Sequence, residues 1–145
     1  MTIWVDADSC PRRIREIVAR RANRSRIPAR FVSGQDVGVR SAGQVRSIVT
    51  EGDADETIVS DSASGDLAVT RDIPLAARLV EKGVVVLNTR GDVYTAENVR
   101  ERLSERDFAY ELRSAAAVSD AARQHGRKEV KAFADAFDRE LQKRA

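Results

Sequence analysis

Two short acidic turns are the residues of this chain best suited to do chemistry. Val5-Asp6-Ala7-Asp8 and Val69-Thr70-Arg71-Asp72 each stand where a short apolar stretch gives way to a helical pattern. In open α/β sheets, ligands bind at the carboxyl ends of the strands, so we expect these carboxylates to meet at one edge. Neighbouring carboxylates repel one another unless a cation or a proton joins them. Hard oxygen ligands favour Mg²⁺ or Mn²⁺, and such ions serve phosphoryl transfer or phosphodiester hydrolysis.

The two turns leave several roles open for their acids. Asp6 is the strongest candidate because it directly follows the first apolar strand and would point into the crevice. Asp8 could hold metal, or it could accept a backbone N–H at the start of the next helix, as could Ser9. Asp72 immediately precedes Ile73-Pro74 and has the same two interpretations. A carboxylate that caps a helix can still face a cation.

Other acids could complete the site, and the sequence leaves open which of them does. One cluster precedes the apolar pair Ile58-Val59, so it could turn a carboxylate into the pocket or stay exposed. Asp66 follows a glycine and is expected in a turn. Two more acids follow the last predicted strand. The candidates are Asp53, Asp55, Glu56, Asp66, Asp92 and Glu97.

Arginines flank the acidic turns. Between Arg12 and Arg40 every basic residue is an arginine, and only Glu16 and Asp36 oppose them. The planar guanidinium suits phosphate, and a basic stretch beside an acidic metal pocket is typical of a nuclease. A solvated helix face is the alternative. The expected substrate contacts are Arg12, Arg13, Ser33, Arg71 and Arg90.

Cysteine chemistry and the common nucleotide motifs have little support. Cys10 lies at a helix start, which lowers a thiol pKa, but the single histidine is His125, in a predicted linker. We therefore expect Cys10 to pack beside Pro11. One cysteine excludes an intramolecular disulfide and a multi-cysteine zinc site. The chain has no Walker-type loop and no GxGxxG motif, so triphosphate and dinucleotide binding lose their usual support.

Composition is that of a single small domain. The chain has 145 residues, of which 42% are hydrophobic, and its 25 basic and 23 acidic residues leave a net charge of +2. This length fits one core. No apolar run reaches the roughly 20 residues of a membrane span, and the charged stretch before Arg13 leaves no room for a signal peptide. We expect a cytoplasmic protein without membrane contact, and the oligomeric state is left open.

Short apolar stretches alternate with helical patterns along the first 90 residues. Helices are expected after Pro11, within 52–64 and after Pro74, where proline suits a first turn. The alternation predicts an α/β fold with a parallel sheet of four or five strands and helices on both faces. The expected strands are 2–5, 27–33, 45–50, 67–70 and 84–87.

After Gly91 the pattern becomes purely helical. Thr95 is the expected N-cap of a charged helix that continues to Arg113, and an amphipathic helix is expected over 127–141. Ser114 to Gly126 is poor in large apolar residues and is predicted to be a linker. The expected organisation is an α/β domain over 1–113, a linker over 114–126, and a C-terminal helix within 127–145 that packs on the domain.

Four segments together resemble the bacterial YaiI/YqxD family of uncharacterised proteins. The match runs over nearly the whole chain, and the first two segments are highly specific in combination. The resemblance implies a three-layer PIN-like fold, which is the architecture of many metal-dependent ribonucleases. The segments are Val5-Asp6-Ala7-Asp8-Ser9-Cys10-Pro11, Gly65-Asp66-Leu67-Ala68-Val69-Thr70-Arg71-Asp72-Ile73-Pro74-Leu75-Ala76, Leu87-Asn88-Thr89-Arg90-Gly91 and Lys131-Ala132-Phe133-Ala134-Asp135-Ala136-Phe137-Asp138-Arg139.

The resemblance also implies which acids matter. By position, the first-strand acid of PIN-like domains falls on Asp6, and the acid of their Thr-x-Asp motif falls on Asp72. The second acid falls in the cluster from Asp53 to Glu56, with Asp55 preferred. The chain departs from the family pattern where Thr89 replaces the usual proline. The segment 114–126 also lacks the expected glycine and proline.

These observations predict Mg²⁺- or Mn²⁺-dependent phosphodiester hydrolysis, with RNA as the substrate. Asp6, Asp55 and Asp72 are the expected catalytic acids, and Asp6, Asp8 and Asp72 are the expected metal ligands. One rival is a haloacid-dehalogenase-like phosphatase in which Asp6 is the nucleophile, Asp8 its acid partner and Ser33 a residue after a later strand. Another is a noncatalytic RNA-binding or protein-interaction module with the same fold.

Overall fold

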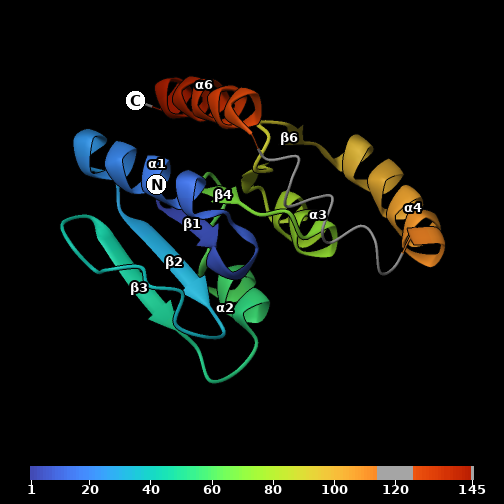
Figure 1. The fold of residues 1–145 in the computed structure, drawn as a ribbon, viewed down its shortest axis with the longest axis horizontal. Helices are drawn as coiled ribbons and strands as arrows, with labels where there is room; N and C mark the ends of the chain where they lie inside the picture. Colours follow the sequence, from blue (N-terminus) through green and yellow to red (C-terminus); the bar gives the residue numbers. More distant parts are fainter. Residues whose placement is uncertain (114–125, 145) are drawn as a thin grey trace.

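One six-stranded sheet organises the molecule in the computed structural model, which describes residues 1–113 and 126–144 (Figure 1). Its strand order is β3-β2-β1-β4-β5-β6. The first five strands are parallel, and β6 runs antiparallel to β5. The predicted parallel α/β sheet is therefore confirmed. The strands are β1 (Ile3–Asp6), β2 (Ala29–Ser33), β3 (Val45–Val49), β4 (Leu67–Val69), β5 (Val85–Leu87) and β6 (Val93–Tyr94).

Helices cover both faces of the sheet and make three layers. Helices α1 and α6 lie side by side on one face, α2 and α3 lie on the other, and α4 packs against α3 (Figure 1). In the part of the chain that the structure describes, no helix is long and apolar enough to cross a membrane. The helices are α1 (Arg12–Ser25), α2 (Ala54–Asp61), α3 (Ile73–Glu81), α4 (Ala96–Arg113) and α6 (Arg127–Arg144), with a 3-10 turn, η1 (Ala7–Ser9), before α1.

The alternation of side chains along the strands divides the core in two. In β1, Ile3 and Val5 pack with α1 and α6, whereas Trp4 packs with α2 and α3. The stacked rings of Phe133 and Phe137, with centroids 5.5 Å apart, bring α6 into the first of these cores. A strand buried on both sides reads as a continuous apolar run, which is why the period-two signal was weak in the sequence.

Helix starts follow the expected chemistry. Asp72 caps α3 by accepting a hydrogen bond at Oδ1 from the backbone N–H of Leu75, 3.0 Å away, and proline occupies the first turn. Asp53 caps α2 through the N–H of Asp55. Before α4, the hydroxyl of Thr95 accepts from the N–H of Asn98. The predicted caps at Asp72 and Thr95 are confirmed.

Two elements were not predicted from the sequence. The turn η1 separates β1 from α1, and β6 is a two-residue strand at the edge of the sheet. Such elements are too short to show a periodic pattern in the sequence. Neighbouring parts of the structure hold them in place. The strands that were expected lie within two residues of their predicted ends. Most of the predicted linker, 114–125 with His125, lies outside the described residues.

A tight turn fastens the end of the sheet to α6. The side chain of Asn88 holds the turn, because its Oδ1 accepts from the N–H groups of Arg90 and Asp92, 2.9 and 3.0 Å away. Gly91 in this turn has φ of +91°, and a Cβ placed there would lie 2.6 Å from the carbonyl oxygen of Ala132 in α6. Only glycine fits such a close approach to a neighbouring backbone.

Gly91→Ala is expected to lower the free energy of unfolding by about 2–4 kcal/mol, because backbone strain adds to a clash with α6. Gly65→Ala is the matched control, since Gly65 has φ of +92° with no atom within 4 Å of an added Cβ. It should lose only the backbone part, about 1–2 kcal/mol. Urea unfolding of both variants measures the difference. Equal losses would contradict the close contact between this turn and α6.

Candidate functional site

The candidate site lies where β1 and β4 sit side by side. The chain passes from β1 to β2 and β3 on one side of the sheet, and then returns to β4 on the other side of β1. Such a reversal leaves a crevice beyond the carboxyl ends of the two strands, which is where α/β sheets bind ligands. Asp6 ends β1 and Thr70 follows β4, and the Thr70 hydroxyl donates to Oδ2 of Asp6 over 2.7 Å. The two acidic turns thus share one edge.

Asp6 is the most buried acid of this edge, with 5% of its surface exposed. Its Oδ2 accepts hydrogen bonds from Thr70 Oγ1 and, over 2.9 Å, from Ser9 Oγ. Burial raises the pKa of Asp6. The two hydroxyl bonds lower it in part, and the charges of Asp72 and Asp8 raise it further. The site therefore holds its central carboxylate in surroundings that disfavour its charge.

Asp72 both caps α3 and faces the other acids. Its backbone N–H donates to Thr70 Oγ1 over 3.0 Å, so one hydroxyl links the two turns. Its charge raises the pKa of Asp6 and of Asp55. The two roles considered for Asp72 are thus compatible, because a cap uses one carboxylate oxygen and leaves the charge directed at the crevice.

Asp55 joins the site from the first turn of α2. Its pKa is raised to about 6, first by partial burial, then by the charges of Asp6, Asp72 and Asp53, and by a hydrogen bond with Asp72. Three separate elements, β1, α2 and α3, therefore bring together the three acids predicted to be catalytic. We call Asp6, Asp55 and Asp72 the acidic site.

The predicted helix cap at Asp8 or Ser9 is wrong. Pro11 stands at the N-cap of α1 without a side-chain cap. Oδ2 of Asp8 accepts instead from the N–H of Gly34 over 2.7 Å and holds the loop that follows β2. The Ser9 hydroxyl donates to Asp6. Both residues belong to η1, and α1 begins only at Arg12.

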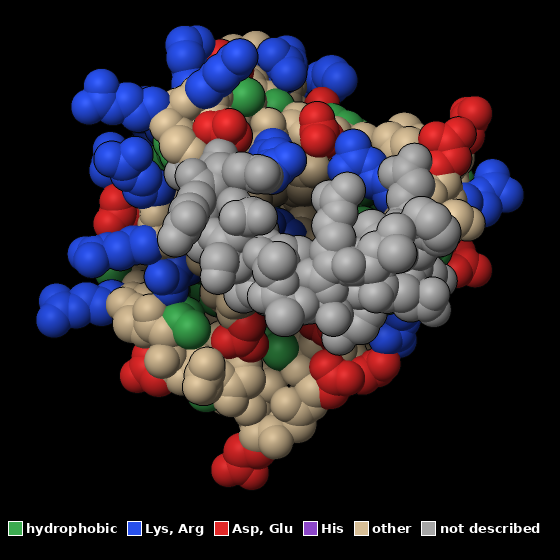
Figure 2. Space-filling view, turned by 45° about the vertical axis from the view of Figure 1, so that its right-hand side comes forward, with side chains coloured by type: hydrophobic (Ala, Val, Ile, Leu, Met, Phe, Trp, Pro, Cys, Tyr) green, Lys and Arg blue, Asp and Glu red, His purple; other side chains and the backbone are tan. Residues whose placement is uncertain are grey.

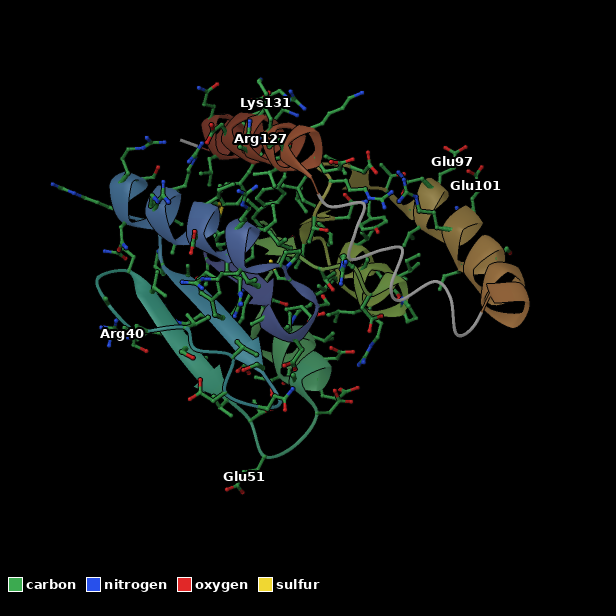
Figure 3. The ribbon with its side chains drawn as sticks, viewed as in Figure 1. Arg40, Glu51, Glu97, Glu101, Arg127 and Lys131 are labelled. Carbon is green, nitrogen blue, oxygen red and sulfur yellow. The ribbon has the colours of Figure 1, made fainter. Side chains whose placement is uncertain are left out.

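Most of the other acidic candidates have structural partners elsewhere. Asp53 caps α2, and Glu56 forms an exposed ion pair with Arg78. Asp92 pairs with Arg102 beside the β5–β6 turn. Glu97 lies on the far end of the molecule, on the outer side of α4 (Figure 3). Of the six acids that could complete the site, Asp55 is the one that the structure brings to Asp6.

Asp66 lies at the opposite edge of the sheet. It precedes β4, whereas the acidic site follows the strands. Its buried carboxylate accepts three N–H bonds, from Thr2 N and Ala63 N over 2.9 Å and from Trp4 Nε1 over 3.0 Å. Asp66 is therefore a structural residue of a turn, as the sequence indicated, and not a member of the acidic site.

Three arginines border the acidic site. Arg12, Arg13 and Arg71 line a cavity of about 400 Å³ that also contains Ser9, the residue that bonds Asp6. We call it the arginine cavity. Arg90 is exposed in the β5–β6 turn, outside this cavity. Lys and Arg side chains gather along the left and upper edges of the face in Figure 2.

Ser33 and Cys10 do not join the acidic site. Alternation along β2 puts Ser33 on the face of Phe31, which packs with α1, whereas Asp6 shares the face of Trp4. The buried Oγ of Ser33 has no hydrogen-bond partner in the described part of the chain. Burial raises the pKa of the Cys10 thiol to about 12, and the charges of Arg15 and Arg71 lower it only in part. This agrees with the packing role expected for Cys10.

The acidic site offers carboxylate and hydroxyl oxygens as its donors. Among residues 1–113 and 126–144, no group of three or more Asp, Glu, Cys or His is arranged to hold a metal ion directly. Mg²⁺ commonly keeps several waters and uses one or two carboxylates. Both hydroxyl bonds of Asp6 fall on Oδ2. Ser9 and Thr70 were not predicted to support Asp6, although Thr70 lies within one acidic turn and Ser9 directly follows the other.

Comparison with known proteins identifies relatives along the full length of the chain, while no solved structure gave a match. A UPF0178 protein of Syntrophobacter fumaroxidans is 46% identical over 147 residues, covering 99% of this chain and 96% of the relative. One of Treponema pallidum is 44% identical, covering 99% and 82%. One of Myxococcus xanthus is 44% identical, covering 97% and 94%. The family model described as "Uncharacterized BCR, YaiI/YqxD family" matches residues 4–143. This chain therefore belongs to the YaiI/YqxD family.

Proposed function

We propose that this protein is a divalent-metal-dependent nuclease with a PIN-like site that hydrolyses phosphodiester bonds of RNA. The observation that carries the proposal is the convergence of three acids at one edge: Thr70 Oγ1 donates to Asp6 and accepts from the N–H of Asp72, and the charges of both acids raise the pKa of Asp55. Collecting three carboxylates at a partly buried edge costs stability, because they repel one another. A cation bound among them would reverse that cost.

Each acid of the site would have its own role. Asp6 and Asp72 would hold a hydrated Mg²⁺ or Mn²⁺, with Asp8 and Asp55 in support. Such an ion supplies an acidified water and stabilises negative charge on phosphate oxygens. Asp55 would accept the proton of the attacking water, a role that its place beside Asp6 and Asp72 supports.

The arginine cavity supplies the complementary charge. Arg12, Arg13 and Arg71 can donate paired N–H bonds to phosphate oxygens. Ser9 lines that cavity and also bonds Asp6, so a phosphate held by the arginines would lie next to the acidic site. Phosphate contacts of this kind fix the position of a strand without reading its bases.

The phosphatase rival has less support. It needs Asp8 as the acid partner of Asp6, and Gly34 engages only Oδ2 of Asp8, so this requirement does not separate the two functions. It also uses Ser33, whose side chain faces α1. The noncatalytic module predicts retained RNA binding without cleavage. A direct cleavage assay separates that module from the proposed nuclease.

The test is cleavage of single-stranded RNA in Mn²⁺ or in chelator, with Asp72→Asn as the variant. Asparagine also caps helices well, so the start of α3 should survive while the charge is lost. We expect cleavage only with metal, reduced at least about 100-fold in Asp72→Asn, since a metal ion supplies several kcal/mol of charge stabilisation. Asp61→Asn, at the exposed end of α2, is the control and should cleave like wild type.

Each other outcome favours a rival. RNA binding in chelator without cleavage in any metal would support the noncatalytic module. Cleavage that Asp72→Asn leaves intact would remove Asp72 from the mechanism. Capture of a covalent aspartyl-phosphate analogue on Asp6 would support the phosphatase instead.

A further inference from the structure

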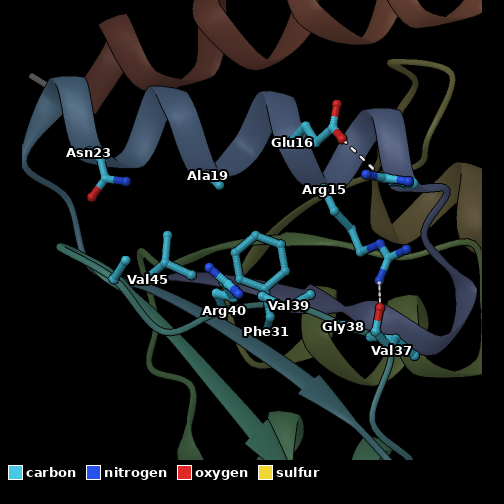
Figure 4. Close-up of a pocket in the computed structure, with 12 residues that line it drawn as sticks. Arg15, Glu16, Ala19, Asn23, Phe31, Val37, Gly38, Val39, Arg40 and Val45 are labelled. Atoms are coloured by element: carbon cyan, nitrogen blue, oxygen red, sulfur yellow. Dashed lines mark hydrogen bonds and ion pairs between the residues drawn. The ribbon is translucent and has the colours of Figure 1, made fainter.

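A second cavity lies on the other side of α1, between this helix and the loop of residues 34–44. Its volume of about 560 Å³ falls within the range of about 300–1,000 Å³ typical of small-molecule sites. Figure 4 shows α1 above it, with Phe31 of β2 and the valines of the loop below. We call it the loop cavity. None of the acidic-site residues lines it.

The loop that walls this cavity is tied down along its length. Asp8 accepts from the N–H of Gly34 at its start, and Asn23 Oδ1 accepts from the N–H of Gln44 over 2.7 Å at its end. Between them, Arg15 Nη1 donates to the carbonyl oxygen of Val37 over 2.8 Å, as drawn in Figure 4. A cavity with fixed walls binds a ligand without first ordering the loop.

The charge of the lining favours an anion. Three arginines, Arg12, Arg15 and Arg40, line the cavity, and Glu16, the acid among the lining residues, forms an ion pair with Arg12 over 3.1 Å. Nε of Arg15 is buried and has no hydrogen-bond partner among the described residues. An anionic oxygen in the cavity would instead pair with the charged guanidinium groups of Arg15 and Arg40 that line it.

The remaining lining is apolar. It consists of Ala19 of α1, Phe31 of β2, Val45 of β3 and two valines of the loop, Val37 and Val39. An inorganic ion would leave this surface without contact. A ligand that joins a phosphate to a flat, largely apolar ring system would fill both parts of the cavity, and guanidinium groups bind phosphate and also stack on rings.

We propose that the loop cavity binds a nucleotide, with its phosphate at Arg15 and its base against the apolar wall. The nucleotide could be free or could be one unit of an RNA strand. Arg12 lines both this cavity and the arginine cavity, so a strand could pass from one to the other. The proposal does not require metal or cleavage, and its failure would leave the proposed nuclease untouched.

Binding of AMP and of a short oligoadenylate, measured by calorimetry in chelator, tests the proposal. We expect Arg15→Gln and Arg40→Gln each to weaken binding at least about 5-fold, and Ala19→Phe, which fills the cavity, to weaken it more. Arg24→Gln removes an exposed arginine of α1 outside the cavity and should bind like wild type. Inorganic phosphate should bind more weakly than AMP.

The outcomes decide both the site and the source of the nucleotide. AMP binding that depends on Arg40 and Ala19 would support a site for free nucleotides. Binding of the oligoadenylate alone, with the same dependence, would support a subsite for a strand. Wild type that binds neither probe, or binding that Arg40→Gln and Ala19→Phe leave unchanged, would overturn the proposal. Because Arg40 is exposed, its variant tests the charge of the cavity even if Arg15→Gln loosens the loop.

Discussion

Asp6→Asn is expected to stabilise the metal-free protein at pH 7.5 and to abolish its stabilisation by Mg²⁺ or Mn²⁺. Both hydroxyl bonds of Asp6 fall on Oδ2, so an amide oxygen can take its place and keep Thr70 and Ser9 bonded. The substitution removes a buried charge and the repulsion from Asp72. We expect a gain of about 1–2 kcal/mol, the scale of a partly screened repulsion between carboxylates.

The pH dependence of stability explains why we expect Asp6→Asn to be more stable than wild type. Burial and neighbouring charges raise the pKa of Asp6, and the pKa of Asp55 rises from 3.8 to about 6. Between about pH 4 and 6 the folded protein therefore holds protons that the unfolded chain has released. Stability without metal falls as pH rises through this window. For Asp55, which is half-buried, the fall is on the order of 1 kcal/mol after solvent screening.

Asp6→Asn should flatten this pH dependence, because it removes one titrating acid and one of the charges that raise the pKa of Asp55. Urea unfolding in chelator between pH 4 and 7.5, repeated with Mg²⁺ at pH 7.5, measures both effects. Asp61→Asn should follow the wild-type curve. A variant that unfolds more easily than wild type at pH 7.5, or that is still stabilised by metal, would contradict the role given to Asp6.

The central pair of the acidic site was predictable because it depends on topology. Asp6 and Asp72 each stand at the junction of a strand and a helix, and parallel strands bring such junctions to one edge. Asp55 was harder to select, since Asp53 and Glu56 stand beside it. The start of α2 places the three acids differently. Asp53 caps the helix, Glu56 pairs with Arg78 on the surface, and Asp55 faces the crevice.

The errors at Asp8 and Ser33 have local physical causes. A 3-10 turn shifted the start of α1, so Asp8 became the anchor of a loop 26 residues away in sequence. Ser33 does end β2, but the side chains of a strand alternate, and its side chain lies on the same face as that of Phe31. The sequence shows which residues of β2 share a face of the strand. Which of the two faces packs against α1 is settled only when the helices pack on the sheet.

Asp66 illustrates what a sequence cannot supply. Its place in a turn was predicted from the preceding glycine, but two of its three donors lie more than 60 residues away. Such contacts exist only once β1 and β4 are paired. Asp66 thus joins the start of the chain to the two central strands, β1 and β4. The contact lies at the amino ends of these strands, whereas the acidic site lies at their carboxyl ends.

Asp66→Ala is expected to lower the free energy of unfolding by about 3–5 kcal/mol, a large part of the total stability of a small domain. The alanine would leave three N–H groups, on Thr2, Trp4 and Ala63, without their acceptor. Asp66→Asn should lose less, about 1–3 kcal/mol. Its amide oxygen can replace Oδ2, which accepts from Trp4 and Ala63, while its NH₂ would oppose the N–H of Thr2.

Trp4 is the single tryptophan of the chain, so its fluorescence during urea unfolding reports directly on this edge of the sheet. Asp61→Ala, at an exposed position, should change stability by less than about 0.5 kcal/mol. If Asp66→Ala loses less than about 1 kcal/mol, the three hydrogen bonds do not hold this edge together. Because Asp66 is remote from the acidic site, Asp66→Asn should still be stabilised by Mg²⁺, whereas Asp6→Asn should not. The two substitutions therefore separate the acid that holds the sheet together from the acid proposed to bind metal.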